Sequence, residues 1–170
     1  FTYESVFNQV TSVTDKNGNS TAYTYDSKGN CTGISKPLGI TLTYTYDSYG
    51  NMATSIDGRG LTTTTVYDGN NRLISVTHPI GTESFTYDNV GNMLTQTDAN
   101  GNATNYTYDG LNRRLTEQNA LGEQTSFTYD ANRNILTATY ANGNQSNFTY
   151  DQLNRKLTET DGLGTVQTYS

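Results

Sequence analysis

The chain has 170 residues, a formal net charge of −6 and a mean hydropathy of −0.70. Leu, Ile, Val and Phe supply only 30 of its residues, a share typical of disordered segments. However, the charged fraction is low, at 15%, and 11% of the residues are aromatic. Disordered chains combine low hydrophobicity with high net charge and few aromatic residues. The composition therefore favours a folded chain in which Tyr and Thr, both strand formers, replace aliphatic residues.

These features exclude several classes of protein. No apolar run approaches the length that a membrane-spanning helix needs, and no signal-peptide pattern is found. The ten Lys and Arg residues are spread along an acidic chain, so nucleic acid is not an expected partner. Cys31, the single cysteine, can form neither an intrachain disulfide nor a thiolate metal site alone.

A 21-residue repeat runs through the chain. The dipeptide Tyr-Asp recurs at nearly constant spacing, with its tyrosines at Tyr25, Tyr46, Tyr67, Tyr87, Tyr108, Tyr129 and Tyr150 and its aspartates at Asp26, Asp47, Asp68, Asp88, Asp109, Asp130 and Asp151. A degenerate copy, Tyr3-Glu4, precedes them. Such self-similarity indicates a repeat architecture. We interpret residues 1–170 as a single array, cut from a longer repeat protein because both ends fall in the same phase of the motif.

Other residue types recur at fixed positions relative to the Tyr-Asp dipeptide. Another aromatic residue stands two positions before most of the repeat tyrosines, and Leu or another apolar residue usually stands seven positions after them. Fourteen positions after each repeat tyrosine comes a glycine that we expect to lie in a turn: Gly39, Gly60, Gly81, Gly101, Gly122, Gly143 and Gly164.

Each repeat is predicted to form two strands and two turns. In residues 105–108 the aromatic rings alternate with polar side chains, so both rings should point to one face of a strand. Asp109 is expected to cap the backbone N–H groups of the turn that follows, before a second strand over residues 114–118. Asn-Gly in the next turn, as at Asn100-Gly101, predicts a two-residue hairpin loop.

The sequence therefore predicts an all-β fold, an antiparallel β-meander of about eight repeats and about sixteen strands. Each repeat should contact mainly its neighbours, as in other repeat proteins. The tyrosine and phenylalanine rings, with the Leu of the intervening strand between them, are expected to form a stripe that replaces an aliphatic core. A long sheet must twist, so we expect a curved or spiral sheet, and its free strand edges favour association with other repeats or identical chains.

No catalytic residue, metal site or cofactor site is predicted. Successive repeat aspartates should stand about 10 Å apart, too far to share a proton or an ion. Residues 15–19 and 98–102 resemble the start of a calcium loop, but both lack the later Gly and Glu, so hairpin turns are the better interpretation. His78 has no nucleophile or orienting partner in a recognisable motif, and we interpret it as a turn residue.

The repeat resembles that of the RHS/YD-repeat family. Residues 87–92, Tyr-Asp-Asn-Val-Gly-Asn, and residues 46–51, Tyr-Asp-Ser-Tyr-Gly-Asn, match most closely, and the resemblance covers the whole chain. The family comprises bacterial polymorphic toxins, insecticidal toxin complexes, wall-associated proteins and teneurins, in which the repeats wind into a hollow shell. The resemblance implies wall material of an extracellular or cell-surface protein. The family's shell-end motif, where some members carry an aspartyl self-cleavage site, and its variable C-terminal toxin region are not found, so neither activity is implied.

We therefore expect a structural, non-enzymatic segment that forms the wall of an encapsulating shell or a tubular fibre. The alternative is an adhesion repeat that binds carbohydrate or a cell-surface partner through exposed Tyr and Asn, because aromatic rings stack on sugars. The low aliphatic content favours the first hypothesis, since the rings are the main apolar surface that the chain can bury.

Overall fold

The computed structural model describes residues 1–169, which form seventeen β-strands and one short 3-10 turn, η1 (Pro37–Gly39). The all-β prediction is confirmed, with one strand more than the sixteen or so expected. Within the described residues, no helix has the length and apolar composition needed to cross a membrane. The chain divides into two units, and the boundary between Glu83 and Ser84 lies within a strand, β9 (Gly81–Tyr87).

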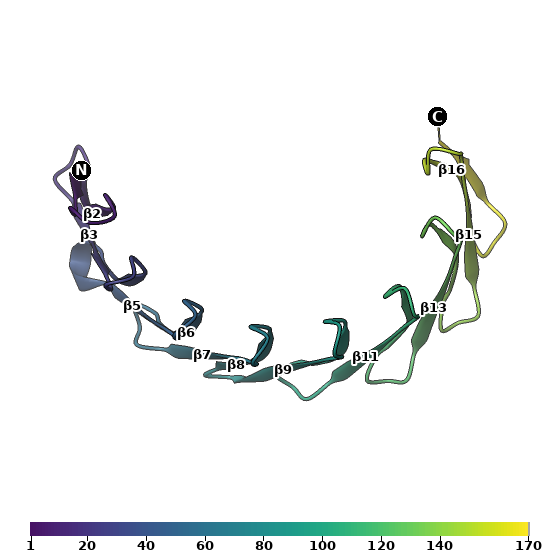
Figure 1. Ribbon diagram of the computed structural model, residues 1–170, viewed down its shortest axis with the longest axis horizontal. Coiled ribbons are helices and arrows are strands. Elements are labelled where there is room, and N and C mark those ends of the chain that lie inside the picture. Colours follow the sequence, from purple (N-terminus) through teal and green to yellow (C-terminus); the bar gives the residue numbers. More distant parts are fainter. Residues whose placement is uncertain (170) are drawn as a thin grey trace. The chain divides into compact units, whose positions relative to one another are not determined.

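The first unit is an antiparallel meander in which each strand pairs with the next. Its strands are β1 (Thr2–Tyr3), β2 (Val10–Thr14), β3 (Ser20–Tyr25), β4 (Cys31–Ser35), β5 (Thr41–Tyr46), β6 (Met52–Ile56), β7 (Thr62–Tyr67) and β8 (Leu73–His78). The purple-to-teal part of Figure 1 shows these hairpins following one another in chain order.

The second unit repeats this arrangement. The part of β9 from Ser84 onward pairs with β10 (Met93–Thr97), and each later strand again pairs with the next. The later strands are β11 (Ala103–Tyr108), β12 (Arg114–Gln118), β13 (Gln124–Tyr129), β14 (Ile135–Thr139), β15 (Gln145–Tyr150), β16 (Lys156–Thr160) and β17 (Val166–Thr168). The predicted β-meander is thus confirmed in each unit.

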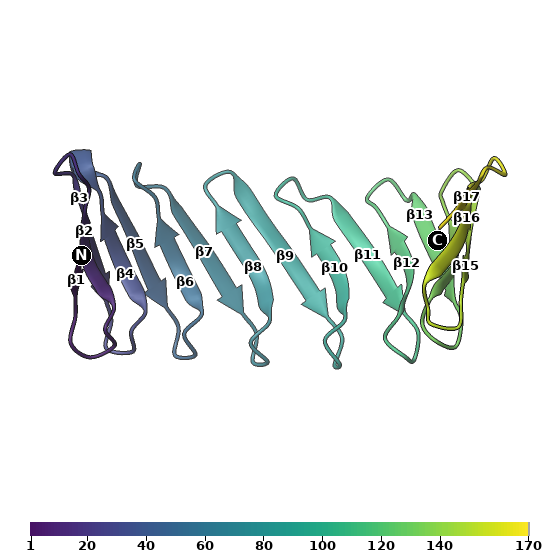
Figure 2. The ribbon, with the colours of Figure 1, turned by 90° about the horizontal axis from the view of Figure 1, so that it is seen from above.

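Two kinds of turn alternate along each unit. The turns that follow the repeat tyrosines lie along one edge, here called the Tyr-Asp edge, and the turns that hold the repeat glycines lie along the opposite edge, here called the glycine edge (Figure 2). Because strands run up and down in a meander, every second connection returns to the same edge.

Both kinds of turn share one geometry. At Asp98–Asn102 the N–H of Asp98 donates to the carbonyl of Asn102 at 3.0 Å, and the N–H of Gly101 donates to the carbonyl of Asp98 at 3.0 Å. Gly101 has φ 84°, whereas Asn100 is not among the residues with positive φ. A two-residue type I′ loop needs positive φ at both central residues, so the prediction of a two-residue Asn-Gly hairpin is wrong. The loop has three residues and ends on a left-handed glycine.

The one shorter repeat has a different turn. Between β8 and β9 only Pro79 and Ile80 form the loop, and Gly81 already begins β9 with φ 155°. Gly81 therefore does not take the left-handed position that the other repeat glycines occupy at φ 75–84°. The loss of one loop residue accounts for the shorter spacing of the Tyr-Asp motif at this point of the sequence.

A β-bulge follows every Tyr-Asp turn. In the β11–β12 hairpin, Thr107 pairs with Thr116 but Tyr108 pairs with Arg114, so Leu115 is the extra residue. Leu115 is 37% exposed. From the sequence, the Leu side chain is expected to lie directly between successive rings. In the structure Arg114 lies opposite Tyr108, and Glu117 lies opposite Tyr106. A bulge adds one residue to one strand and increases the local twist.

The two faces of each sheet have different chemistry. Directly opposed residues share a face, so Tyr106 and Glu117 lie on one face, the aromatic face, and Thr107 and Thr116 lie on the other, the threonine face. On the threonine face, the hydroxyls of opposed threonines are 2.6–2.7 Å apart at Thr45/Thr54, Thr86/Thr95, Thr107/Thr116, Thr128/Thr137 and Thr149/Thr158.

Neither face is covered by a second layer within the described residues, and almost no side chain is buried. Only Ala138, at 4% exposure, and Ser146, at 6%, fall in the buried class among residues 1–169. The repeat tyrosines are half-buried rather than enclosed. Stability must therefore come from strand pairing, turn bonds and partial ring burial instead of a closed core.

Arg133 occupies the left-handed turn position with φ 76°, where the matching residues are Gly29, Gly50, Asn71, Gly91, Asn112 and Asn154. Left-handed backbone costs a residue with a β-carbon about 1–2 kcal/mol, and Asn tolerates it better. We expect Arg133→Asn to raise the free energy of unfolding by about 0.5–1 kcal/mol, measured by urea denaturation followed by circular dichroism. Arg133→Ala is the control, because Ala has a β-carbon, as Asn does, but lacks the short polar side chain that lets Asn tolerate left-handed backbone. An equal gain in both variants would contradict this argument.

Candidate functional site

No cluster of three or more His, Cys, Asp or Glu side chains that could hold a metal ion occurs among residues 1–169. His78 is the last residue of β8, so its interpretation as a turn residue is wrong. Its ring lies 3.3 Å from the Thr63 hydroxyl and 3.8 Å from the Glu83 carboxylate. The repeated features of the molecule are its turns, its tyrosine hydroxyls and the grooves between neighbouring turns.

Each turn aspartate binds the backbone of its own turn. Asp109 Oδ1 accepts the N–H groups of Leu111 at 2.8 Å and Arg113 at 3.0 Å, and its Oδ2 accepts Arg113 Nε at 2.6 Å. The same backbone bonds are made by the other repeat aspartates, Asp26, Asp47, Asp68, Asp88, Asp130 and Asp151. One carboxylate thus satisfies two backbone donors and one side chain four positions on.

Most turns on the glycine edge are capped by a side-chain oxygen in the same way, which the sequence analysis did not predict. Asp15, Asp57, Asp98 and Asp161 accept the N–H groups two and four positions on, and Asn119 does so through its amide oxygen. The signal was present in the sequence, because each of these residues stands three positions before a repeat glycine, or before Gly18 in the first turn. Most repeats are therefore built from two similar halves, each a strand followed by a carboxylate- or amide-capped turn. The exceptions are the turns that begin at Lys36 and Tyr140 and the shorter loop of Pro79 and Ile80, which have neither Asp nor Asn at the capping position.

These bonds lower the pKa of the carboxyls. In Asp47 the side-chain amide of Asn51 is the largest cause, and in Asp109 it is the backbone N–H of Arg113. The pKa is shifted downward also at Asp15, Asp26, Asp57, Asp68, Asp88, Asp98, Asp130, Asp151 and Asp161. A carboxylate that accepts several N–H groups favours its charged form, so the turns are most stable with ionised aspartate.

Three repeat tyrosines, Tyr25, Tyr46 and Tyr129, bind the backbone of the preceding hairpin. Tyr129 Oη donates to the carbonyl of Arg114 at 2.6 Å, and Arg114 is the residue that pairs with the preceding repeat tyrosine, Tyr108. Tyr25 and Tyr46 make the equivalent bonds to the carbonyls of Val10 and Cys31, both at 2.8 Å. The column of repeat tyrosines contains no Phe, unlike the aromatic column two residues earlier. This absence of Phe was the signal in the sequence that the hydroxyl group itself is needed at these positions.

Burial raises the pKa of several of these hydroxyls. Desolvation is the largest cause at Tyr25, Tyr46, Tyr108, Tyr129 and Tyr150. The neutral hydroxyl is the form that donates a hydrogen bond. Ionisation at high pH would therefore remove the bond to the preceding hairpin as well as place a charge against partly buried surface.

Successive turns on the Tyr-Asp edge are joined by side chains. In the first unit Gln9 Nε2 donates to the carbonyl of Gly29 at 2.9 Å and Lys28 Nζ to that of Ser48 at 2.9 Å, while the Asn51 amide donates to Asn71. In the second unit Asn92 donates to Asn112 at 3.0 Å, Arg113 Nη1 to the carbonyl of Asp130 at 2.8 Å, and Asn134 to Asn154 at 2.9 Å. Each unit thus carries a continuous series of bonds from turn to turn.

Ion pairs lie between the rings of the aromatic face in the second unit. Arg114 is 2.7 Å from Glu117, and its guanidinium lies over the rings of Tyr106 and Phe127, 5.8 and 5.0 Å from their centroids. Lys156 repeats this arrangement with Glu159 at 2.8 Å and with the rings of Phe148 and Tyr169. The pairs neutralise their own charge and cover the rings with the apolar stems of long side chains.

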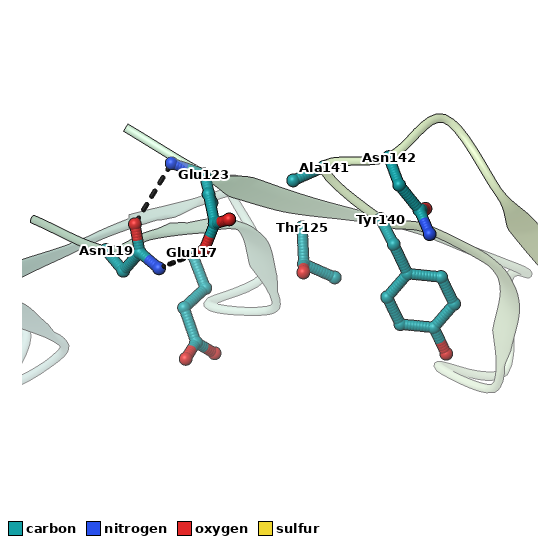
Figure 3. A pocket seen from close by; sticks show the side chains of 7 residues that line it. All are labelled: Glu117, Asn119, Glu123, Thr125, Tyr140, Ala141 and Asn142. Carbon is teal, nitrogen blue, oxygen red and sulfur yellow. Dashed lines mark hydrogen bonds between the residues drawn. The ribbon is translucent and has the colours of Figure 1, made fainter. Parts of the chain in front are cut away.

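Grooves separate neighbouring turns on the glycine edge. Figure 3 shows one of about 360 Å³, in which the side chains of Glu117, Thr125 and Tyr140 point to the same side of the ribbon. Asn119 and Glu123 form one wall and are joined by two hydrogen bonds, at 2.7 and 3.0 Å. Nothing in this groove resembles a nucleophile with its base. Its shape follows from the gap between two turns.

The pKa shifts predict a stability plateau with two limits. Aspartate pKa values lowered in the folded state stabilise it above the ordinary carboxyl value of about 4, and this contribution is lost as the pH falls through the lowered values. Tyrosine pKa values raised in the folded state stabilise it below about pH 10, and this is lost as the pH rises through the raised values. We expect urea midpoints that are constant near neutral pH and fall at both limits; a constant midpoint at high pH would contradict a role for the hydroxyls.

The tyrosine bond itself is tested by Tyr129→Phe. This change leaves the Arg114 carbonyl without its donor, so we expect the free energy of unfolding to fall by about 1 kcal/mol in urea denaturation at pH 7. Tyr106→Phe is the matched control, because Phe127 and Phe148 already occupy that column, and its effect should stay within about 0.5 kcal/mol. Equal losses in the two variants would show that only the ring matters.

Comparison with known proteins agrees with this geometry. Residues 2–161 match the family model described as the teneurin YD-shell. A search of curated proteins by sequence finds no match.

Solved structures with the same fold come from toxin complexes. In the crystal structure of TcdB2-TccC3-Cdc42 the likeness has a TM-score of 0.61 at 18% identity, covering 87% of this chain and 9% of the other. TcdB2-TccC3 gives a TM-score of 0.60 at 18% identity, with 87% and 9% covered. The Tc holotoxin pore of Photorhabdus luminescens gives 0.57 at 18% identity, with 92% and 8% covered.

The chain spans less than a tenth of each of these structures' chains, and at this identity the likeness shows a shared fold. The match to the family model covers nearly the whole sequence. The chain belongs to the teneurin YD-shell family.

Proposed function

We infer that the chain is a structural, non-catalytic stretch of wall in a larger YD-repeat shell on a secreted or cell-surface protein. Two continuous sets of hydrogen bonds within each unit support this function. Backbone hydrogen bonds join each strand to the next, and side-chain hydrogen bonds join each turn to the next along the Tyr-Asp edge. A ribbon held in this way needs no second layer, which suits a thin wall between an interior and an exterior.

Several features support a wall over an adhesion surface. The hydroxyls of Tyr25, Tyr46 and Tyr129 are bonded to the backbone of the neighbouring hairpin, so they serve the ribbon itself. The amides of Asn92 and Asn134 are bonded to the next turn and to their own aspartate. Hydrogen bonds from these hydroxyls and amides to a carbohydrate would compete with the bonds that join the repeats.

Electron microscopy of the intact parent protein tests the proposal. We expect a closed shell in which this segment forms part of a wall one sheet thick. A long uniform filament would show that the segment forms a tubular fibre and not a shell. A segment that protrudes from the assembly as a separate arm would contradict the wall function. Glycan-array binding by the 170-residue chain, lost in a folded Tyr106→Ala variant, would support the adhesion function instead.

A further inference from the structure

Three turns of the glycine edge hold an Asn-Gly dipeptide that is exposed to water. They are Asn17-Gly18, Asn100-Gly101 and Asn142-Gly143. In such a dipeptide the backbone nitrogen of Gly can attack the side-chain amide carbon of Asn, because Gly has no β-carbon to obstruct the approach. Residues 99–102 and 141–144 share the sequence Ala-Asn-Gly-Asn. A difference in reactivity between these two sites therefore has to come from what surrounds the tetrapeptide.

The backbone holds the attacking nitrogen in the same way in all three turns. The N–H of Gly18, Gly101 and Gly143 donates to the carbonyl three residues earlier, at 3.1, 3.0 and 2.9 Å. The φ angles of these glycines are 84, 84 and 81°. Release of the glycine nitrogen from its turn bond is thus a similar requirement at the three sites.

The side-chain cap distinguishes the third turn from the other two. Asp98 Oδ1 accepts the N–H groups of Asn100 and Asn102, both at 2.9 Å, and its Oδ2 accepts the Asn102 amide at 2.9 Å. Asp15 makes the same three bonds in the first turn. Tyr140 stands at this position in the third turn and has no carboxylate. Local opening of the third turn therefore breaks fewer hydrogen bonds.

The missing cap also redirects one backbone N–H toward the reactive amide. In the third turn the N–H of Asn144 donates to Oδ1 of Asn142 at 3.0 Å. In the matched turn the equivalent N–H, that of Asn102, donates to Asp98. A donor aimed at an amide oxygen stabilises the negative charge that develops there when a nucleophile adds to the amide carbon. The fold thus activates the Asn142 amide with an N–H that aspartate takes up in the other two turns.

We propose that Asn142 is a site of spontaneous deamidation that reacts faster than Asn17 and Asn100. The Gly143 nitrogen gives its proton to water and forms a bond to Cγ of Asn142. The bond from Cγ to the side-chain nitrogen then breaks, and this nitrogen takes up a proton and leaves as ammonia. Water hydrolyses the cyclic imide at either carbonyl, which gives aspartate or isoaspartate. The net reaction consumes water, releases ammonia and involves no change of oxidation state.

The two products affect the turn differently. Aspartate keeps an oxygen where the N–H of Asn144 donates. Isoaspartate carries the main chain through its β-carbon and so lengthens the loop between β14 and β15. Because loop length fixes the register of a hairpin, isoaspartate is expected to weaken the pairing of Thr139 with Gln145, which lies next to this loop.

The test follows the three sites in the intact 170-residue chain at mildly alkaline pH. Cleavage after Lys and Arg separates them on peptides 17–28, 73–113 and 134–155, in which mass spectrometry locates each conversion of amide to acid. We expect Asn142 to react about tenfold faster than Asn100 in the folded chain, and at the same rate in denaturing guanidinium. Equal rates in the folded chain, or a difference that persists in guanidinium, would overturn the proposal.

Variants at the capping position test the cause. Tyr140→Asp should slow the reaction of Asn142 about tenfold, whereas Tyr140→Ala, the control, should leave it unchanged. Tyr140→Asn should also slow it, since Asn119 caps its own turn without a charge. Slowing by Tyr140→Asp alone would assign the effect to charge and contradict the role of the bonds. Circular dichroism establishes that the variants keep their strands.

The reverse change is made in the matched turn. Asp98→Ala removes the cap, so the reaction of Asn100 should accelerate about tenfold while that of Asn142 stays the same. An unchanged rate at Asn100 would show that the cap does not control the reaction.

Discussion

Most turns of the ribbon depend on one interaction, the acceptance of two backbone N–H groups by a carboxylate or amide oxygen at the start of a three-residue turn. The turn that begins at Tyr140 makes the same backbone bonds without a carboxylate, so the side-chain contact stabilises this loop but is not what sets its length. The loop length fixes the register of the hairpin that the turn closes. Because most turns on both edges share this loop, the chain reverses direction at regular intervals with the same geometry. The side chain four positions on, Asn or Arg, then extends the contact, as with Asn51 and Asn71 or Arg113 and the carbonyl of Asp130.

A sheet with two open faces has to be stabilised by interactions that a globular domain uses only in part. The backbone ladders run from strand to strand, and the hydroxyls of Tyr25, Tyr46 and Tyr129 each join a hairpin to the one before it. Ion pairs such as Arg114–Glu117 fill the spaces between rings that aliphatic residues would fill elsewhere. Since every one of these contacts joins neighbours, the stability of such a ribbon is spread along its length.

Much of this fold follows from the sequence, because the constant period of the Tyr-Asp motif and the alternation of rings with Thr specify strands and turns directly. The strand over residues 114–118 coincides with β12. The loop type was not predictable from the Asn-Gly dipeptide, because Asn100-Gly101 and Asn142-Gly143 form the same three-residue loop although Asp98 precedes one and Tyr140 the other. The bulge at Leu115 and the bond from Tyr129 to the Arg114 carbonyl depend on how neighbouring strands and hairpins fit together, which the spacing of the motif does not specify.

The turns on the glycine edge carry polar residues (Asn17, Arg59, Asn100 and Asn142) in alternation with apolar ones (Leu38, Ile80, Leu121 and Leu163) at one position, so the pattern on this edge repeats every two repeats. On the Tyr-Asp edge Arg72, Arg113 and Arg155 alternate with Asn51, Asn92 and Asn134, whereas Asn30 and Asn51 stand in consecutive repeats. Gain or loss of one repeat during evolution would exchange an apolar for a polar residue at this position of every later glycine-edge turn. A lineage that keeps this pattern has to lengthen or shorten its wall by two whole repeats at a time.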